Sequence, residues 1–350
     1  MIEMRSDTFT LPTAEMMEAI AQAPLGDDVY GEDPTVVRLE ALAAKMLGKE
    51  AGLLLPSGTM ANLCAMMAHC PRGTKVLVGN ETDIYIYEAG GASVCGGLVY
   101  EPIRTRADGQ LALEDLEAAC PVDPEDPQFA LPSLVCLENP HNRCGGKVLP
   151  LEYLASVQRF ARARSLPVHL DGARLFNAAI ALGVPAADIA EHADSVQFCL
   201  SKGLSSPIGS MLVGRGPFIK KANRWRKMLG GGMRQAGIFA AAGIVSLERM
   251  VQRLAEDHAH ARHLAQALRT LPGIDVMDDT IETNMVFFRV HDPRFTVESF
   301  LSTVTRRGLR LAELGHGRIR AVTHANVSRT QVDEAIQILR DVLYSGPEAP

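Results

Sequence analysis

The sequence lacks a long uninterrupted apolar run. Its most apolar stretches are broken by Pro56, Gly58 and Asn62, and they fall well short of the roughly 20 residues that a membrane-spanning helix needs. The first seven residues, MIEMRSD, hold no apolar core of the kind that a signal peptide carries. We therefore expect a soluble protein that is neither exported nor inserted in a membrane.

Cysteine pairs with metal-binding or redox spacing are also missing. The seven cysteines are an odd number, and no two of them stand in a CxxC arrangement. In a chain of 350 residues this usage favours reduced thiols over a disulfide framework or a zinc site. We expect a cytoplasmic protein that binds no metal.

Strong positive charge is absent as well. The formal net charge is −6 and no long basic run occurs, whereas a nucleic-acid-binding protein usually carries a basic patch. Histidines gather in residues 257–263, DHAHARH, but no suitably spaced carboxylate or thiol completes a metal site there. We interpret this segment as a solvated helix surface.

What the sequence does contain is an alternation of short apolar runs with longer helical segments. A chain of this length with 47% hydrophobic residues can bury one large core and a smaller one. Strands that alternate with helices predict an α/β protein with a mainly parallel sheet. The expected strands are Gly52–Leu55, Lys75–Val78, Ser133–Leu137, Pro167–Asp171, Ser195–Leu200 and Ile208–Val213, and the expected helices are Val36–Leu47, Leu151–Ser165 and Pro185–His192.

The pattern changes after about residue 240. Apolar residues from Ile244 to Ala261 recur at helical spacing and predict one long helix. Two apolar runs, Asn284–Val290 and Ile319–Thr323, and a last helical stretch follow. We expect a large domain over residues 1–240 and a smaller α+β domain over residues 241–350.

The chemistry is indicated by two side chains at strand ends. Asp171 closes one apolar run, and Lys202 follows the next apolar run along the chain. A carboxylate and a lysine that leave neighbouring strands at one sheet edge suit pyridoxal phosphate. The lysine would form a Schiff base with the cofactor aldehyde, and the aspartate would keep the pyridine nitrogen protonated. Desolvation and nearby positive charge are expected to lower the pKa of the lysine.

A glycine turn between a strand and a helix supplies a third element. Ser57, Gly58 and Thr59 form it, and the backbone N–H groups at a helix start can bind a phosphate. Each element also has a structural interpretation. The turn can be a simple helix cap, Asp171 can cap the next helix, and Lys202 can be a solvated surface residue.

Motifs along most of the chain resemble one family. The sequence resembles the low-specificity L-threonine aldolases, pyridoxal-phosphate enzymes of fold type I, from Met1 to about Leu343. The motifs are RSDT at 5–8, GDDVYGEDP at 26–34, PSGT at 56–59, EAGG at 88–91, ENPHN at 138–142, HLDGAR at 169–174, SKG at 201–203, RWRK at 224–227, GGGMRQ at 230–235 and RAVTH at 320–324. The resemblance implies a large domain with a mainly parallel seven-stranded sheet and a smaller α+β domain.

The resemblance also implies residue roles at the cofactor. Lys202 takes the place of the Schiff-base lysine, and Asp171 that of the partner of the ring nitrogen. The phosphate cradle corresponds to Ser57, Gly58 and Thr59.

Further roles concern the substrate. Arg174 corresponds to a group near the cofactor's phenolic oxygen and the substrate carboxylate, and Arg320 and Ser6 are placed to hold that carboxylate. Arginine suits this because its planar fork can donate two hydrogen bonds. His141 corresponds to a histidine near the substrate's β-hydroxyl and would accept its proton. Its structural interpretation is a loop histidine that caps backbone groups. Tyr30 is expected among the substrate-binding residues.

Other implied positions reach a neighbouring subunit. Tyr30, Lys227 and Arg234 resemble residues that enter the partner's site, which implies a homo-oligomer, either a dimer or a homotetramer.

Three positions depart from the family pattern, Asp83, Met60 and Pro140, and the first matters most. Asp83 stands where the family usually has a histidine that stacks on the cofactor ring. A carboxylate offers no such ring face. We count Asp83 among the cofactor-contacting and catalytic residues, and the departure leaves the reaction open.

The leading hypothesis is a pyridoxal-phosphate-dependent carbon-carbon lyase. It would cleave L-β-hydroxy-α-amino acids such as threonine, allo-threonine or aryl serines to glycine and an aldehyde. The alternatives on the same scaffold are an amino-acid racemase, a β-eliminating lyase or a transaldolase. A non-catalytic binding protein is a further alternative, which the presence of Lys202, Asp171, Arg174 and Arg320 disfavours.

Overall fold

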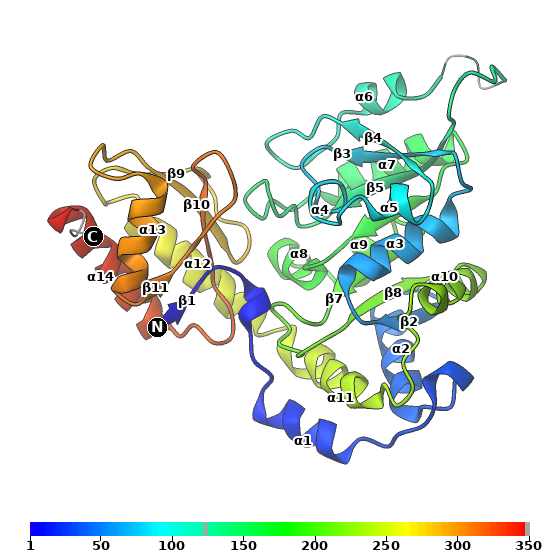
Figure 1. Ribbon diagram of the computed structural model, residues 1–350, viewed down its shortest axis with the longest axis horizontal. Helices are drawn as coiled ribbons and strands as arrows, with labels where there is room; N and C mark the ends of the chain where they lie inside the picture. Colours follow the sequence, from blue (N-terminus) through cyan, green and yellow to red (C-terminus); the bar gives the residue numbers. More distant parts are fainter. Residues whose placement is uncertain (122, 124, 347–350) are drawn as a thin grey trace.

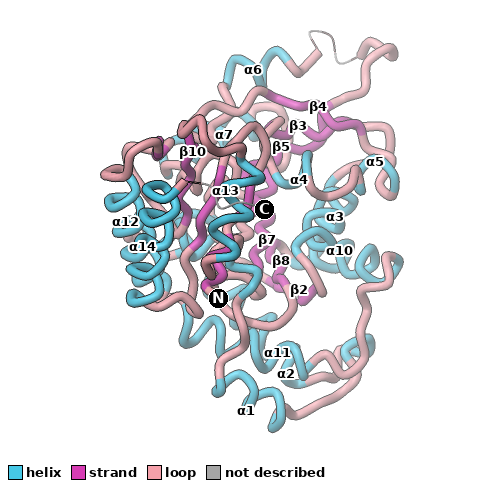
Figure 2. Tube along the Cα trace, turned by 60° about the vertical axis from the view of Figure 1, so that its left-hand side comes forward, coloured by secondary structure: helices cyan, strands magenta, loops and turns pink. Residues whose placement is uncertain are grey.

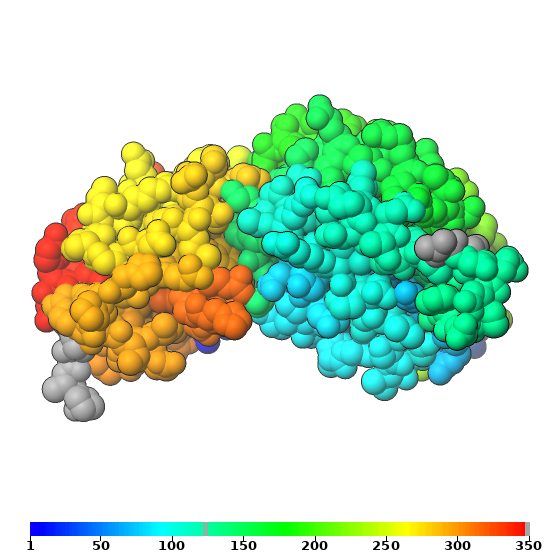
Figure 3. Space-filling view, turned by 90° about the horizontal axis from the view of Figure 1, so that it is seen from above, coloured from blue at the N-terminus to red at the C-terminus, as the bar shows by residue number. Residues whose placement is uncertain are grey.

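The structure, a computed structural model, describes residues 1–121, 123 and 125–346. Figure 3 shows a larger lobe drawn mainly in cyan and green beside a smaller lobe in yellow to red. The larger lobe holds a sheet between helices, and the smaller lobe combines a sheet with helices α12, α13 and α14 (Figure 1). These helices span Leu254–Leu268, Val297–Arg306 and Arg329–Ser345. The predicted α/β class is confirmed.

The sheet of the larger lobe has the predicted composition. Within the described residues it has seven strands, in the order β2 (Ala51–Leu55), β8 (Ser210–Gly214), β7 (Ser195–Cys199), β6 (Val168–Asp171), β5 (Pro132–Glu138), β3 (Lys75–Gly79) and β4 (Val99–Ile103). Strand β8 is antiparallel to both of its neighbours, β2 and β7. The strands from β7 to β4 are all parallel. The mainly parallel seven-stranded sheet is therefore confirmed.

The predicted strands lie within two residues of the observed ones, but the edge strand β4 was missed. Its sequence is Val-Tyr-Glu-Pro-Ile, and Val99 is 46% exposed. A proline cannot donate to a sheet ladder and is confined to edge strands and strand ends. The half-exposed, proline-containing run gave no apolar signal.

Both faces of this sheet are covered by helices. Leu53 and Leu55 pack in one cluster with α3 and α10, whereas Leu54 points to the other face and joins the main core, as the two-residue period of a strand requires. Figure 2 shows α3 next to α10, and α1, α2 and α11 grouped together. The helices are α1 (Ala14–Gln22), α2 (Pro34–Met46), α3 (Gly58–His69), α4 (Asp83–Ile86), α5 (Gly91–Val94), α6 (Leu113–Ala118), α7 (Leu151–Arg162), α8 (Leu175–Leu182), α9 (Ala186–Ala190), α10 (Gly216–Met228) and α11 (Gly237–Val245).

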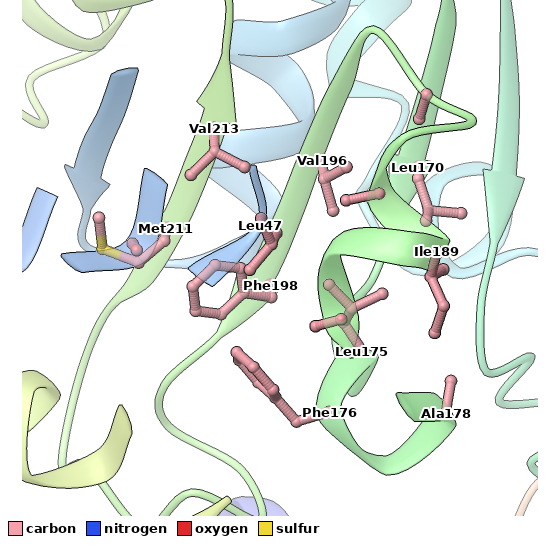
Figure 4. Packing of buried hydrophobic residues seen from close by; sticks show 14 of the residues in the cluster. Leu47, Leu170, Leu175, Phe176, Ala178, Ile189, Val196, Phe198, Met211 and Val213 are labelled. Atoms are coloured by element: carbon pink, nitrogen blue, oxygen red, sulfur yellow. The ribbon is translucent and has the colours of Figure 1, made fainter. Parts of the chain in front are cut away.

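The main core fixes the two strands that lead to the chemical groups. In Figure 4, Phe176 of α8 lies against Phe198 of β7, with ring centroids 5.3 Å apart at 84°. Such edge-to-face pairs contribute about 0.5–1.5 kcal/mol beyond their buried area. Helix α8 begins just after Asp171, and β7 ends just before Lys202. The packing therefore fixes the positions of both strand ends.

The smaller lobe is built on an antiparallel sheet. In the described part of the chain its order is β12 (Ala312–Glu313), β13 (Ile319–Val322), β10 (Met285–Val290) and β9 (Ile274–Val276). The first strand of the chain, β1 (Ile2–Glu3), pairs in parallel with β11 (Leu309–Arg310). The N-terminus thus joins the core of the smaller lobe, where Ile2 and Met4 are buried. No described helix combines the length and apolar character that crossing a bilayer requires.

Two expectations about the long helix were wrong. The segment from Ile244 to Ala261 is divided, because a π-helical turn at Ser246–Met250 separates α11 from α12. The histidine-rich segment is not a solvated surface either. Asp257, His258 and His260 are at most 5% exposed, because this face of α12 turns inward, where His258 hydrogen-bonds Asn177.

The hydrophobic clusters suggest where the chain divides. Side chains as far as Leu254 pack with the large sheet, and those from Ala261 onward pack with the small sheet. We propose residues 1–240 and 241–350 as the two domains, with the start of the second, as far as Leu254, packed against the core of the first.

Candidate active site

A cavity of about 360 Å³ lies where the carboxyl ends of β6 and β7 meet. Asp171 is the last residue of β6, and Lys202 comes three residues after the end of β7. Because neighbouring parallel strands end at the same sheet edge, both side chains face one space. The cavity lining includes Lys202, Asp171, Asp83, Asn62, Glu88, Gln197 and the turn residues Ser57, Gly58 and Thr59.

Asp171 is held by three donors. The Nε2 of Gln197 and the backbone N–H of Ala173 donate to Oδ1, over 2.7 and 3.0 Å, and the Nδ2 of Asn62 donates to Oδ2 over 2.9 Å. Burial raises the pKa of this carboxyl above its ordinary value, with a further rise from Asp83, although Lys202 and the hydrogen bonds from Gln197 and Ala173 act in the opposite direction. The arrangement fixes the orientation of the carboxylate. Gln197 and Asn62 line the cavity and orient Asp171. The sequence interpretation missed them, although each is a polar residue within an apolar run.

Glu88 is a second acidic group that was given no role. Its Oε1 accepts from the Nδ2 of Asn62 over 2.8 Å, and its Oε2 has no hydrogen-bond partner among the described residues. Burial, together with the charge of Asp171, raises its pKa well above the ordinary value. Glu88 therefore holds its proton more strongly than an ordinary glutamic acid, and its Oε2 is left for a ligand.

The glycine turn is shaped to receive a phosphate. Ser57 caps α3, and its Oγ accepts from the backbone N–H of Met60 over 3.2 Å. A side chain at Gly58 would place its Cβ 3.0 Å from the Sγ of Cys199, so glycine keeps the turn open. Backbone N–H groups and the helix dipole favour an anion at this end. The amine, the carboxylate and the anion cradle around one cavity fit pyridoxal phosphate.

The pKa of Lys202 departs from the expected direction. Burial and Arg174 lower it, but Cys199, Asp83 and Asp7 outweigh them, and the net shift is upward. The sequence-based expectation of a lowered pKa is therefore wrong for the protein without its cofactor. The expectation took account of desolvation and of nearby positive charge. It did not include the acidic side chains that raise the pKa of Lys202.

Arg174 is held by a partner far away in the sequence. Its Nε and Nη2 donate to the two oxygens of Asp7 over 2.8 and 2.7 Å, and both side chains are buried. Burial raises the pKa of Asp7, but Arg174 outweighs burial and holds it below the usual range. Arg174 lies outside the lining of the main cavity. Ser6 is buried beside this pair, and its Oγ accepts from the N–H of Thr8.

Arg320 and Asp83 are joined by one amide. The Nη1 of Arg320 donates to the Oδ1 of Asn142 over 2.7 Å, and the Nδ2 of Asn142 donates to the Oδ1 of Asp83 over 3.0 Å. The Nε of Arg320 has no partner within the described structure. Burial and then Arg174 lower the pKa of Arg320 to about 10. Asp83 thus lines the cavity as predicted, connected to an arginine that has a donor to spare.

His141 is close to this group but outside the cavity lining. It is 1% exposed, and neither ring nitrogen has a hydrogen-bond partner in the part of the chain that the structure describes. Burial lowers its pKa to about 4. The ring is therefore neutral at pH 7. Its catalytic role stays a prediction.

The residues expected to reach a neighbouring subunit lie on the surface. Tyr30 is 75% exposed, Lys227 is exposed, and Arg234 is exposed and donates to Asp27 over 3.0 Å. None of these three described residues lines the chain's own cavity. Their contribution to a partner's cavity also stays a prediction.

Comparison with known proteins identifies the family. A family model described as beta-eliminating lyase matches residues 3–291. A curated relative, the low specificity L-threonine aldolase of Escherichia coli K12, is 47% identical over 334 residues, which cover 95% of this chain and 97% of that protein. The chain belongs to the low-specificity L-threonine aldolase family. The resemblance seen in the motifs is confirmed.

Solved structures agree with this family assignment at the level of the fold. The threonine aldolase of Leishmania major superimposes with a TM-score of 0.82 at 18% identity, covering 98% of this chain and 100% of that one. SPT solved with pyridoxal phosphate gives a TM-score of 0.75 at 18% identity, covering 98% and 88%. The fold type I prediction is confirmed, and the predicted cofactor is confirmed for the aldolase family.

Proposed function

We propose that this protein is a pyridoxal-phosphate-dependent aldolase. It cleaves L-β-hydroxy-α-amino acids, among them threonine, allo-threonine or aryl serines, to glycine and an aldehyde. One observation carries the proposal: a single cavity brings the Lys202 amine, the Asp171 carboxylate and the Ser57–Thr59 turn together. The 47% identity to an Escherichia coli enzyme named as a low specificity L-threonine aldolase supports the same reaction.

We distinguish two ends of the site: the cofactor end, whose residues would hold pyridoxal phosphate, and the substrate end, whose residues would hold the amino acid. When bound, pyridoxal phosphate supplies an electron-accepting ring for the electrons of the broken Cα–Cβ bond. Asp171 would hold the ring nitrogen, Lys202 the aldehyde carbon, and the Ser57–Thr59 turn the phosphate. Arg320, Arg174 and Ser6 would hold the substrate carboxylate, with the unpartnered Nε of Arg320 as an available donor.

Cleavage also requires an acceptor for the proton of the substrate's β-hydroxyl. Two residues are proposed for this role, Asp83 and His141. Asp83 lines the cavity, and its orientation is fixed by Asn142. His141 lies outside the lining and is neutral. We therefore propose Asp83 as the direct acceptor and His141 as a residue that acts beside it.

The test is incubation of the cofactor-loaded protein with threonine, allo-threonine and phenylserine. Equimolar glycine and aldehyde are expected from at least one of them. A protein that binds the cofactor and releases neither product from any of the three contradicts the proposal. Asp83→Asn and His141→Phe variants then decide between the two acceptors, because the true acceptor's variant loses more of kcat.

A second candidate rests on Asp83. A carboxylate in place of a ring-stacking histidine changes the environment of the cofactor, and a racemase, a β-eliminating lyase or a transaldolase is the alternative. Exchange of the Cα hydrogen of alanine for deuterium without aldehyde release would indicate a racemase. Release of a 2-oxo acid and ammonia from serine would indicate elimination.

We further propose that the enzyme is a cytoplasmic homo-oligomer, either a dimer or a tetramer. Large apolar side chains are exposed near Tyr30, including Leu25 and Val29, and such groups mark protein contacts. The cytoplasmic location is supported by the cysteines: all seven lie in the described residues and none is in a disulfide, as is usual in a reducing compartment. Light scattering of the purified protein measures the assembly directly, and a monomer at micromolar concentration would contradict it.

A further inference from the structure

A line of hydrogen bonds leads away from Asp171 through the interior of the larger lobe. Asn62 donates to Asp171 through its Nδ2, and its Oδ1 lies 3.0 Å from the Nε2 of His169. The Nδ1 of His169 lies 2.8 Å from the Oγ of Ser195, and that Oγ lies 2.8 Å from the Nε2 of His69. Asn62, His169 and Ser195 are at most 1% exposed. We call Asn62, His169, Ser195 and His69 the buried relay.

The direction of every hydrogen bond in the relay follows from Asn62. Both hydrogens of its amide are taken by carboxyl oxygens, one of Asp171 and one of Glu88. Its Oδ1 can therefore only accept, so the Nε2 of His169 carries the hydrogen. The Nδ1 of His169 must then accept from the Ser195 hydroxyl, which in turn accepts from the Nε2 of His69.

The charge states agree with this single direction. Burial lowers the pKa of His169 to about 3 and that of His69 to about 4. Each ring is neutral at pH 7 and has one donor and one acceptor nitrogen. All the hydrogens of the buried relay thus point toward Asp171, and in a low-dielectric interior each such bond polarises the next.

The far end of the buried relay is also fixed. His69 stacks on Phe218, with ring centroids 4.3 Å apart at 22°. It lies at the C-terminal end of α3, the helix whose N-terminal end forms the phosphate cradle. Two contacts thus hold the His69 ring, and the relay does not end in a mobile side chain.

We propose that the buried relay is a positioning network that holds the Asn62 amide hydrogen on Asp171 and so keeps Asp171 an ionised partner for the ring nitrogen of the cofactor. The inference rests on the proposed function, since it concerns the same cofactor. Without His169, the Asn62 amide could turn over and present its oxygen to the Asp171 carboxylate. His169, Ser195 and His69 act through Asn62 and are not catalytic residues themselves.

The experiment compares Ser195→Ala and His169→Leu with the wild-type enzyme. Each is loaded with pyridoxal phosphate carrying ¹⁵N in its ring, and the ¹⁵N chemical shift at pH 7 reports the protonation of that nitrogen. We expect a protonated nitrogen in the wild type and a smaller protonated fraction in both variants. The dissociation constant of the cofactor should rise about tenfold, the effect of losing one hydrogen bond to a charged group.

Two further variants separate positioning from simple stabilisation. Ser195→Thr keeps the hydroxyl and should restore the wild-type signal. His258→Leu is the matched control, because His258 is equally buried but hydrogen-bonds Asn177 outside the relay. It should lower the Tm and leave the ¹⁵N signal unchanged.

The outcomes distinguish the inference from the function on which it rests. If folded Ser195→Ala keeps the wild-type ¹⁵N shift and affinity, the positioning role is rejected. Ser195→Ala decides alone if His169→Leu does not fold, since it only deletes one oxygen. If the wild-type protein itself binds no cofactor, the proposed function fails instead.

Discussion

The two ends of the cavity differ in how completely their polar groups are satisfied. At the cofactor end, every side-chain nitrogen and oxygen of Asp171, Asn62 and His169 has a hydrogen-bond partner. Two oxygens beside them, Glu88 Oε2 and Gln197 Oε1, have none among the described residues. At the substrate end, among the described residues, both ring nitrogens of His141 and the Nε of Arg320 have none. All of these side chains are buried.

The difference shows which half is more nearly complete before a ligand arrives. A buried polar group without a partner costs about 1–3 kcal/mol, and a ligand that supplies the partner recovers that cost. The Asp171 carboxylate at the cofactor end is therefore preorganised, whereas the substrate end is organised by binding. Asp83, the main departure from the family pattern, lies in the less complete half.

The largest expected effect concerns the buried pair of Asp7 and Arg174, whose hydrogen bonds to each other are formed before a ligand arrives. Asp7→Asn leaves a buried guanidinium without its counter-ion and should lower the free energy of unfolding by about 3–5 kcal/mol. Urea unfolding of the wild type and variant measures this. A change below about 1 kcal/mol, the range of exposed ion pairs, would contradict it.

The same pair predicts a pH dependence. Burial raises the pKa of Asp7, but Arg174 outweighs it, and the folded-state pKa lies below the ordinary value. The stabilisation is therefore fully present above the unfolded pKa of about 3.9 and is lost as the pH falls toward the folded value. The stability difference between wild type and Asp7→Asn should shrink in that acidic range and stay constant between pH 6 and 8.

The next largest effect is expected from Asp171→Asn, on kcat. Removal of the charge at the ring nitrogen should lower kcat by roughly 10²–10³-fold, as loss of one preorganised electrostatic group does. Steady-state assay of aldehyde release at saturating cofactor measures it, with Asp171→Glu as the control that keeps the charge. Activity within a few-fold of wild type would show that the cofactor end does not depend on this carboxylate.

Arg320→Ala tests the less complete half. Loss of a charged donor to the substrate carboxylate should raise KM by roughly 10- to 100-fold, while the dissociation constant of the cofactor stays unchanged. Arg318→Ala is a matched control just before strand β13, which holds Arg320, since Arg318 donates mainly to backbone carbonyl groups. Weakened cofactor binding in Arg320→Ala would show that the two ends are not separate.

The smallest expected effect comes from Asp83→His. It restores the residue type usual in the family and should raise threonine cleavage by a few-fold if the carboxylate alone limits that reaction. Asp83→Asn is the control for loss of charge without a ring. If Asp83→His leaves the rate unchanged or lowers it, this carboxylate is adapted to the reaction of this enzyme.

The sequence predicted the cofactor end better than the substrate end for a physical reason. Asp171 and Lys202 come together because parallel neighbouring strands end at one sheet edge, and apolar runs locate those strands. Asp83, in contrast, was placed at the cavity only through the family resemblance. The signals for Asp171 and Lys202 are different in kind. These are local signals.

Contacts between distant segments gave no such signal. Asp7 binds Arg174 although 167 positions separate them in the sequence. The residues next to a buried arginine do not identify such a distant partner. The orientation of His141 depends on its loop, and the buried faces of α12 depend on packing against α8. The buried relay was missed because His169 and Ser195 look like isolated polar residues within apolar strands.

The most direct test of the central claim is the point of attachment of the cofactor. The enzyme is loaded with pyridoxal phosphate, reduced with borohydride to fix the cofactor to the amine that holds it, digested, and analysed by mass spectrometry. The account predicts the added mass on the peptide that contains Lys202, and none in Lys202→Ala. Attachment at another lysine, or no attachment in the wild-type protein, would contradict it.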